Sequence, residues 1–421
     1  MGHGLDADLE SDYRGDGVAY KERVERTNSA SQPANLLVLI LLLFSGVVSS
    51  LAFTAVGPGV PRIATYFAGP GDATFRAQLV LTMAPIGMAV GGITGARIIA
   101  RLGVKRTLLL GYAGYGLFGM APLVLNNLNA IYIARALTGW SIVTADVSLM
   151  LILGELYEGE GRSRILGFRQ AIGSCSTVGG TLLSGWLIQG FGWRAPFWLF
   201  AIALVYVTLS ALAFRTRLRP PERTSWRNLP TVAALWPLYA AMLVLAVAHA
   251  MPHFELPSLL VADGLNDISR VSWFPAASAT VSILSATAFG WIYGRADRWM
   301  LVLLLVLMGL GLAGIGVAPS FTLVFVSVIV EGIGGGWMIP YMLNRMLDKA
   351  PGEIKSQAVG LMMSTMFVGQ FLNPLVNKPL RDAFGLHGAF VAIGAVLLAI
   401  AAAVAVSALR PRPVEPRAAN L

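Results

Sequence analysis

The sequence holds ionisable side chains deep inside long apolar stretches, where a charge is unfavourable. Arg135 and Asp146 share one such stretch, and Glu331 lies in the middle of another. A charge near the centre of a bilayer costs about 3 kcal/mol on insertion scales, so each of these residues requires a function or a partner. A carboxyl group removed from water can exchange a proton near neutral pH. We therefore predict that Glu331 and Asp146 carry protons.

Arg135 and Asp146 are too far apart for a direct ion pair. Their spacing of eleven positions places them on one helix face, about 16 Å apart along the axis. Both can line one cavity, and Gly139 on nearly the same face permits a close helix contact. Two structural alternatives remain open. Glu331 can stay protonated and hydrogen-bond a neighbouring helix, and Arg135 can bind backbone carbonyls of the first or fifth span.

The residues that follow Glu331 are candidates for substrate contact. Met338 and Met342 lie within about 20° of its helix face, and an acid with two thioethers suits a cationic or amphipathic substrate. Methionine also fills irregular gaps in cores or binds soft metals, and a tryptophan here can equally pack between helices. We predict no metal site. The predicted substrate-binding residues are Met338, Met342, Trp337, Gln370 and Asn373.

Two histidines form a separate pair. His249 and His253 are one helical turn apart near the expected outer end of the seventh span, with Pro252 between them. Such a pair can relay a proton or bind a metal. We expect instead a vestibule position without chemistry.

The composition indicates an integral membrane protein. Apolar residues make up 56% of the 421 residues and charged residues 13%, against roughly 25% charged in soluble domains. This excludes a soluble enzyme, a nucleic-acid-binding protein and a disordered scaffold. One cysteine and four histidines exclude a disulfide framework, a zinc finger and an iron–sulfur site. Without a Ser/His/Asp set or a phosphate loop, we predict neither an enzyme nor a cofactor.

Twelve apolar stretches are long enough to form membrane-spanning helices, each of which needs about 20 residues. Their hydrophobicity is continuous rather than alternating, which excludes a β-barrel. The predicted fold is therefore an all-α polytopic membrane protein with twelve transmembrane helices. The expected spans are 35–57, 77–96, 106–125, 129–153, 165–189, 194–214, 231–253, 270–292, 299–318, 320–344, 356–378 and 387–409.

Positive charge sets the expected orientation. Arg and Lys concentrate in the loops on the side of the N-terminus, which predicts that this side is cytoplasmic. An even number of spans places both termini there. We expect residues 1–34 to be a disordered cytoplasmic extension without a signal peptide, and 410–421 to be a cytoplasmic tail. The absence of an Asn-x-Ser/Thr sequon is consistent with a bacterial inner membrane.

The chain divides into two halves of six spans. The longest interior polar segment, 215–230, lies between spans six and seven. The halves also repeat, because Gly139 and Gly332 are 193 positions apart, as are Gly167 and Gly360. We predict pseudo-symmetric six-helix bundles over 35–214 and 231–409, with a cavity at their interface and alternating access by rocking. We expect a monomer in the lipid bilayer.

The loop after the second span resembles a family signature. Residues 96–106 read Ala-Arg-Ile-Ile-Ala-Arg-Leu-Gly-Val-Lys-Arg, similar to the G-x-L-x-D-R-x-G-R-[RK] loop of the major facilitator superfamily. The family's aspartate helps to latch the cytoplasmic side, and Ala100 replaces it here, while 290–298 resembles a second-half version. The resemblance covers 35–409 and implies the major facilitator fold. It also implies a gating set of Arg101, Gly103, Arg106, Arg295, Asp297 and Arg298.

Further signatures concern coupling and direction. Arg135 and Gly139 resemble the family's R-x-x-x-G signature, whose arginine is linked to proton coupling, so the resemblance adds Arg135 to the proton-coupling residues. Gly179-Gly180 match the end of the antiporter signature, although Cys175-Ser176 replace its Gly-Pro. The Gly192-Trp-Arg turn is typical of drug-efflux members.

The first functional prediction is proton-coupled export of a small amphipathic or organic molecule, as in the twelve-span drug-efflux branch. The alternative is proton-coupled uptake of a small organic anion or metal chelate, which the broken Gly-Pro signature and the acid-free first span favour. A transporter-like sensor that binds without transporting is a third possibility. The direction of flux, and flux measured beside binding, would separate these. We expect no nucleic-acid partner.

Overall fold

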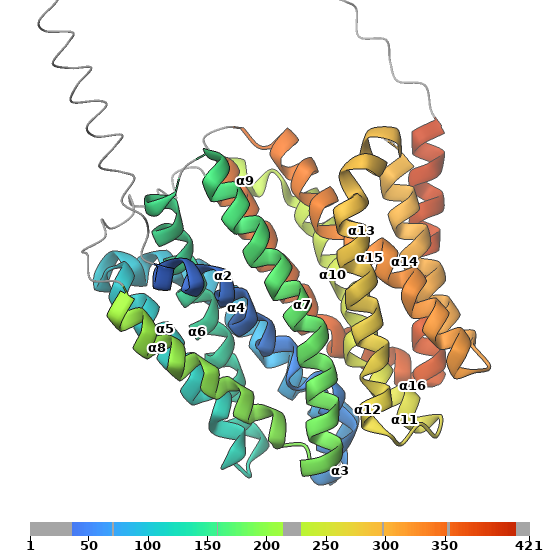
Figure 1. The fold of residues 1–421 in the computed structure, drawn as a ribbon. Helices are drawn as coiled ribbons and strands as arrows, with labels where there is room; N and C mark the ends of the chain where they lie inside the picture. Colours follow the sequence, from blue (N-terminus) through green and yellow to red (C-terminus); the bar gives the residue numbers. More distant parts are fainter. Residues whose placement is uncertain are drawn as a thin grey trace, which may run out of the picture.

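The computed structural model describes residues 36–69, 71–157, 159–213, 229–296, 299–351 and 354–409, which form a helical bundle (Figure 1). The first half contains α2 (Leu36–Thr54), η1 (Gly57–Gly59), α3 (Val60–Tyr66), α4 (Ala73–Leu102), α5 (Val104–Met120), η2 (Ala121–Leu123), α6 (Leu128–Leu156), α7 (Gly159–Phe191), η3 (Ala195–Ala201) and α8 (Ile202–Ala213). The second half contains α9 (Leu229–Ala233), α10 (Trp236–Phe254), α11 (Leu256–Ala262), α12 (Ile268–Val271), α13 (Trp273–Ala296), α14 (Met300–Val317), α15 (Phe321–Lys349) and α16 (Lys355–Leu409).

Several predicted segments lie outside the described residues. These are the tail 1–34, residues 215–228 of the predicted linker 215–230, the tail 410–421, and the gating candidates Asp297 and Arg298.

Among the described residues, ten helical segments are long and apolar enough to cross a membrane. Two features relate this number to the predicted twelve. The helix α5 is apolar but only 17 residues long, and α16 is two helices joined at Gly385, whose φ is 73°. The all-α polytopic prediction is confirmed.

Local sequence determines several helix ends. The Asp72 carboxylate accepts a hydrogen bond from the Phe75 N–H at 2.9 Å and caps α4, and Asn127 and Ser320 cap α6 and α15 in the same way. Gly103 ends α4 with a φ of 81°, a conformation that favours glycine and allows the sharp turn into α5. Gly103 alone therefore connects α4 and α5.

Glycines let the helices of each half pack closely. A Cβ built on Gly139 of α6 would lie 1.8 Å from the Ala84 carbonyl oxygen of α4, and a Cβ on Gly87 would lie 1.8 Å from the Ala136 carbonyl oxygen. Such small residues are typical of membrane helix contacts, because they let two backbones touch. The close approach expected at Gly139 therefore occurs between α4 and α6.

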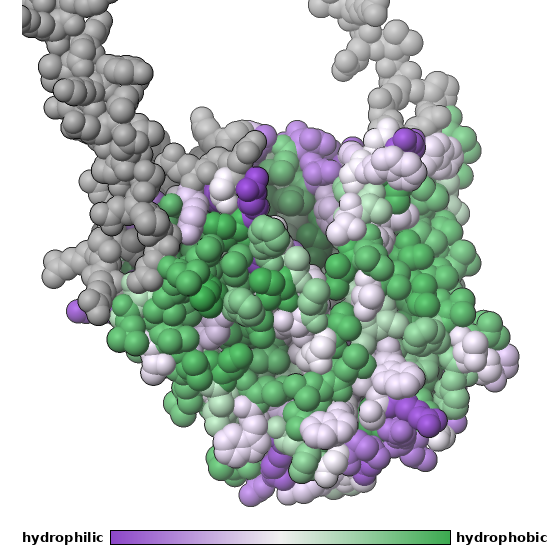
Figure 2. All heavy atoms as spheres, viewed as in Figure 1, coloured by the Kyte–Doolittle hydropathy of each residue, from purple (hydrophilic) through white to green (hydrophobic). Residues whose placement is uncertain are grey.

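The bundle has two faces that we name for reference. The Leu36 face is where α2 begins, α4 ends and α16 ends, and it lies at the top of Figure 1. The Asp72 face is where α4 begins and where α11 and α12 lie. Figure 2 shows a hollow between the two halves that opens at the Leu36 face. The bundle is therefore open at the Leu36 face.

One predicted boundary differs from the structure in a way that affects the site. The seventh span continues from α10 through α11 to Ala262, so His249 lies inside the span and not near its end. The prediction ended this span at the polar residue His253. The predicted fifth span, 165–189, agrees with the segment Arg164–Phe191, and Arg169 lies within it in α7.

Candidate functional site

The buried acid of the second half, Glu331, is paired with a histidine. The Nδ1 atom of His249 on α10 lies 2.8 Å from Oε1 of Glu331 on α15, and the Ser278 hydroxyl of α13 donates to Oε2 at 3.4 Å. The Glu331 side chain is fully buried, whereas the His249 side chain is 21% exposed. The His249 side chain is therefore partly accessible, whereas the Glu331 carboxylate behind it is not.

The glycines at 334–336 make this pair possible. A Cβ on Gly335 would lie 2.3 Å from Nδ1 of His249, and Cβ atoms on Gly334 and Gly336 would collide with Met308 and Ser282. These glycines lie within the helix α15, and they let three neighbouring helices, α10, α13 and α14, approach it closely.

A cavity of about 250 Å³ lies between the two halves and includes both histidines of α10. Its polar side chains also include Gln370 of α16 and threonines of α2 and α7. Its apolar wall includes three phenylalanines, Phe53, Phe254 and Phe367. None of the side chains that line it is Asp, Glu, Lys or Arg. The wall is thus rich in aromatic rings, and among the described residues that line it only the histidines can carry a charge.

Two polar groups at the cavity have particular geometry. Nδ1 of His253 lies 3.3 Å from the His249 carbonyl oxygen, and a carbonyl only accepts, so this nitrogen carries a proton whenever the bond is made. The rings of His249 and His253 are 5.4 Å apart. Oε1 of Gln370 is buried and has no partner among the described residues. The sequence did not predict that either histidine takes part in the site.

The other predicted substrate-binding residues lie in helix contacts. Met338 and Met342 are buried in the apolar core of the second half, because the α15 face that they share with Glu331 is turned inward. The Trp337 indole donates to the Ser285 carbonyl at 3.1 Å, and the Asn373 amide donates to the Val247 carbonyl at 2.7 Å. Of the five predicted residues, Gln370 lines the cavity.

The embedded acid of the first half, Asp146, is paired with an arginine, and its side chain is 26% exposed. Arg169 of α7 donates to Oδ1 of Asp146 at 2.9 Å, and the Ser49 hydroxyl of α2 donates to Oδ2 at 2.8 Å. The Arg169 Nε also donates to the Ser45 hydroxyl at 2.7 Å. The cluster ties α2, α6 and α7 together around a carboxylate that faces a permanent cation.

Arg135 binds backbone carbonyls. Its guanidinium is fully buried and donates to the Ala52 carbonyl of α2 at 2.6 Å and to the Val80 carbonyl of α4 at 3.1 Å. Its NH1 atom has no hydrogen-bond partner among the described residues. This geometry corresponds to the structural alternative, with carbonyls from spans one and two.

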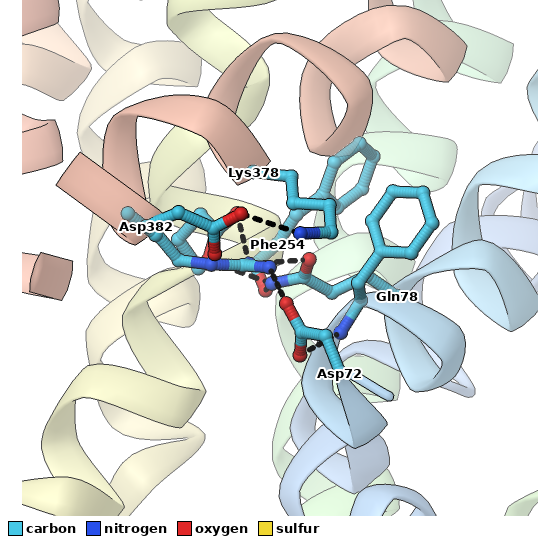
Figure 3. A network of polar contacts seen from close by, with 8 residues as sticks. Asp72, Gln78, Phe254, Lys378 and Asp382 are labelled. Atoms are coloured by element: carbon cyan, nitrogen blue, oxygen red, sulfur yellow. Dashed lines mark hydrogen bonds and ion pairs between the residues drawn. The ribbon is translucent and has the colours of Figure 1, made fainter. Parts of the chain in front are cut away.

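An ionic network that the sequence did not predict closes the Asp72 face (Figure 3). Arg381 of α16 donates to both Glu255 carboxylate oxygens at 2.9 Å, to the Gln78 side-chain oxygen at 2.7 Å and to the Asp72 carboxylate at 2.8 Å. Gln78 in turn donates to Glu255 at 2.7 Å. Asp72 and Gln78 belong to the first half, and Glu255 and Arg381 to the second. We call these four residues the latch.

The charges of the latch are mostly removed from water. The Arg381 side chain is 7% exposed and that of Glu255 is fully buried, while that of Asp72 is 25% exposed. Burial raises the pKa of the Asp72 carboxyl, but the Phe75 N–H and the Arg381 charge together lower that pKa below its ordinary value of 3.8. Asp72 is therefore ionised throughout the physiological pH range.

The sequence held a partial signal for the latch. Glu255 follows His253 and Phe254 directly, and a seventh span extended over the apolar residues up to Ala262 would have included it as an embedded acid. Its partners are far away in the chain, since 126 positions separate Glu255 from Arg381. No local pattern indicates such a pairing.

The four predicted gating residues that the structure describes, Arg101, Gly103, Arg106 and Arg295, lie at the Leu36 face. Arg101 and Arg106 are exposed, on either side of the turn at Gly103. The Arg295 guanidinium lies 4.0 Å from the centre of the Trp291 ring and donates to the Trp291 carbonyl at 3.1 Å. Within the described part of the chain, no group of three His, Cys, Asp or Glu side chains is arranged to hold a metal ion.

Comparison with known proteins gives a family. The sequence profile of the Major Facilitator Superfamily matches residues 42–295 and 238–421. An uncharacterized MFS-type transporter of Mycobacterium tuberculosis is 24% identical over 264 residues, which are 62% of this chain and 35% of that protein. The match therefore spans about a third of the length of that relative.

Two relatives match over more of their length. The multidrug transporter protein MdtP of Bacillus subtilis is 21% identical over 86% of this chain and 72% of its own. The 3-(3-hydroxy-phenyl)propionate transporter of Escherichia coli is 23% identical over 93% of this chain and 98% of its own. These relatives have different substrates, so the comparisons do not single out the drug-efflux branch.

The fold is also that of solved transporters. A bacterial homolog of the human lysosomal transporter Spinster, in an inward-facing and unoccupied conformation, superposes with a TM-score of 0.73 at 16% identity. The superposition covers 90% of this chain and 97% of that one.

Proposed function

This chain belongs to the Major Facilitator Superfamily and is a secondary transporter of small molecules, not an enzyme, and from this premise we propose that it couples transport to protons through Glu331 and His249. One observation carries the proposal, namely the contact of 2.8 Å between the buried acid and a histidine that lines the cavity. With one shared proton, the pair is neutral whether the proton is on the carboxylate or the imidazole. A second proton gives it one positive charge beside the cavity.

Asp146 and Arg135 have structural roles in this proposal. The guanidinium of Arg169 stays protonated at any physiological pH, so Asp146 keeps its charge with it. Arg135 positions α2 and α4 through their carbonyls. Proton exchange is thereby assigned to the second half alone, in place of the two acids predicted from the sequence.

The cycle that we propose is alternating access of two rigid halves, 35–214 and 231–409. In the conformation described here the latch holds the Asp72 face closed, and the hollow opens at the Leu36 face. Arg and Lys in the loops of the Leu36 face favour its location in the cytoplasm, and the membrane would be a bacterial inner membrane. Rocking would break the latch and open the cavity on the other side.

Export and uptake require different coupling. In export, the substrate and the proton compete for the cavity, whereas in uptake they occupy it together. The Gly192-Trp-Arg turn and the similarity to a multidrug transporter support export. The uncharged cavity wall with its histidines supports uptake of an organic anion.

The test uses purified protein in liposomes with an imposed pH gradient and an internal pH dye, to which candidate compounds are added one at a time. We expect a substrate to trigger proton flux in the wild type and in Asp382→Asn, an exposed acid at the Asp72 face that serves as the matched control. Glu331→Gln should abolish this flux. The sign of the pH change gives the direction of coupling.

Two results would contradict the proposal. Unchanged pH-dependent flux in Glu331→Gln would remove the acid from the mechanism. Binding of a compound without any flux would favour the transporter-like sensor.

A further inference from the structure

The cavity has a composition that selects among ligands. It combines three phenylalanines with two histidines and an unpartnered amide oxygen, and its described lining holds no carboxylate. Both oxygens of Glu331, the acid paired with His249, are engaged by His249 and Ser278. A cationic ligand would therefore find no carboxylate among the described lining residues, whereas aromatic rings would find edge and face contacts.

His253 is the residue whose protonation state can change when a ligand binds. Its Nδ1–H is directed to the His249 carbonyl, so Nε2 is the nitrogen that gains or loses a proton. A lone imidazolium in an apolar cavity is unfavourable, because burial penalises the charged form. An anion bound in the cavity offsets this penalty, because it pairs with the positive charge of the imidazolium.

We propose that the cavity binds a small aromatic carboxylate together with one proton. The carboxylate lies on the imidazolium of His253, with His249 one helical turn away, and the ring lies among Phe53, Phe254 and Phe367. Oε1 of Gln370 accepts a hydrogen bond from a hydroxyl or amino group on the ring. The volume of about 250 Å³ limits the ligand to a small molecule.

Proton and anion strengthen each other's binding in this site. If the anion favours protonation of His253 by some factor, the proton favours the anion by the same factor, because the two bindings are thermodynamically linked. The two therefore occupy the cavity together, and an inward proton gradient drives uptake. This inference rests on the proposed function and deepens it. The proton that binds with the anion is placed on His253, one helical turn from the Glu331–His249 pair that exchanges protons, and uptake is chosen over export.

The charged groups around the histidines are compatible with this role. Glu331 of α15 faces His249. At the end of α10, Glu255 is bound by Arg381 of α16 and by Gln78 of α4. The side chains that α2, α4, α7, α13 and α16 contribute to the cavity wall are uncharged. Among the described residues of the wall, no fixed cation competes with the histidines for the ligand, and no fixed anion competes with the ligand for the histidines.

The test measures binding of 3-hydroxybenzoate to the full chain in lipid nanodiscs by calorimetry, at pH 6 and pH 8 and in two buffers of different ionisation enthalpy. The neutral 3-hydroxybenzamide and the cationic 3-hydroxybenzylamine are compared. We expect the carboxylate to bind most tightly, with uptake of about one proton and roughly tenfold weaker binding for each pH unit above neutrality. The amide should bind weakly and without proton uptake.

His253→Gln tests the assigned residue. We expect it to abolish proton uptake and to weaken the carboxylate to about the affinity of the amide, while binding of the amide itself is unchanged. The unchanged amide shows that the variant is folded. His387→Gln, the same substitution at a histidine that contacts Asp263 at the Asp72 face, should leave all three ligands unchanged.

Several results would overturn the inference. These are tighter binding of the amine or the amide, carboxylate binding without proton uptake, undiminished proton uptake in His253→Gln, and no carboxylate binding at millimolar concentration. The proposed function fails separately. Compounds of another class that drive proton flux would overturn the ligand assignment alone, and proton-linked carboxylate binding without flux would overturn the transport proposal alone.

Discussion

Each half of the protein holds an acid within a membrane-spanning helix, and these two acids differ in their partner. Asp146 of the first half contacts Arg169 and Ser49, while Glu331 of the second half contacts His249 and Ser278. An arginine keeps its proton, so in the first pair the carboxyl faces a permanent cation that favours its ionised form. A histidine exchanges its proton near neutral pH, so the second pair has an additional group that can take up or release a proton. The partner, rather than the acid, distinguishes a structural site from a coupling site.

The latch extends this comparison to a third buried acid. Glu255 is as fully buried as Glu331, but its partner is Arg381. By the same reasoning it is a fixed ion pair. Its role is to hold the halves together in one conformation, and the pair separates when the Asp72 face opens.

The largest expected effect is on stability, and it follows from removing the charge of Asp146, the acid paired with Arg169. Asp146→Asn leaves the Arg169 charge without its counter-ion, and breaking such a pair costs about 3 kcal/mol. The free energy of unfolding in mixed micelles should fall by this amount, and Asp146→Asn with Arg169→Gln should recover most of it. Glu331→Gln should lose less, because His249 can become neutral. A larger loss in Glu331→Gln than in Asp146→Asn would refute the comparison.

The next effect concerns the latch. Arg381→Gln removes hydrogen bonds to two carboxylates, and bonds to charged groups contribute about 2 kcal/mol each. The Asp72 face should open, which lengthens the distance between spin labels at Ala68→Cys and Ala262→Cys in a Cys175→Ser background. The matched control is Lys378→Gln, whose exposed pair with Asp382 contributes about 0–1 kcal/mol. Equal distances in both variants would show that the latch does not hold the halves.

A smaller effect is expected when the contact between Glu331 and His249 is weakened without changing the charge of either residue. Gly335→Ala places a Cβ against the His249 ring and pushes it from Glu331, at a cost of about 1–3 kcal/mol for overpacking. Substrate-driven proton flux should fall about tenfold, which corresponds to 1.4 kcal/mol. Gly290→Ala on α13, where a Cβ would contact nothing within 4 Å, should keep normal flux. Normal flux in Gly335→Ala would show that the contact is dispensable.

The smallest expected effect is a pH response that distinguishes the latch from the histidine pair. The pKa of Asp72 is lowered in the closed state, so its stabilising contribution is complete above pH 4 and is lost only as the pH falls through the lowered pKa. The spin-label distance should therefore stay constant from pH 8 to pH 5. Carboxylate binding should change over the same interval. A distance that changes near pH 6 would indicate that a histidine controls the latch.

Much of the architecture follows from local sequence. Continuous apolar stretches indicate the spans, and the charge at Arg135, Asp146 and Glu331 marks residues that need partners. The error in the spans occurred where a polar residue lies within a helix. The seventh span was ended at His253, so Glu255 was not recognised as an embedded acid.

Helix periodicity also misled the choice of substrate residues. Met338 and Met342 share a face with Glu331, as expected, but that face is turned toward the core of the second half. Periodicity determines which side chains share a face, and it does not determine what the face contacts. The cavity lies instead beside α10, and histidine reaches the acid from there.

The sequence by itself determined the helical class, the approximate spans and the three embedded charges, because hydropathy and helical spacing are local properties. Only the tertiary structure decided the partners. Glu331 and His249 are 82 positions apart, and Arg381 and Asp72 are 309 positions apart. A pairing over such distances depends on how helices pack, and the packing here depends on glycines that let particular backbones approach. The partner in turn decides whether a buried acid is locked in one charge state or free to exchange a proton.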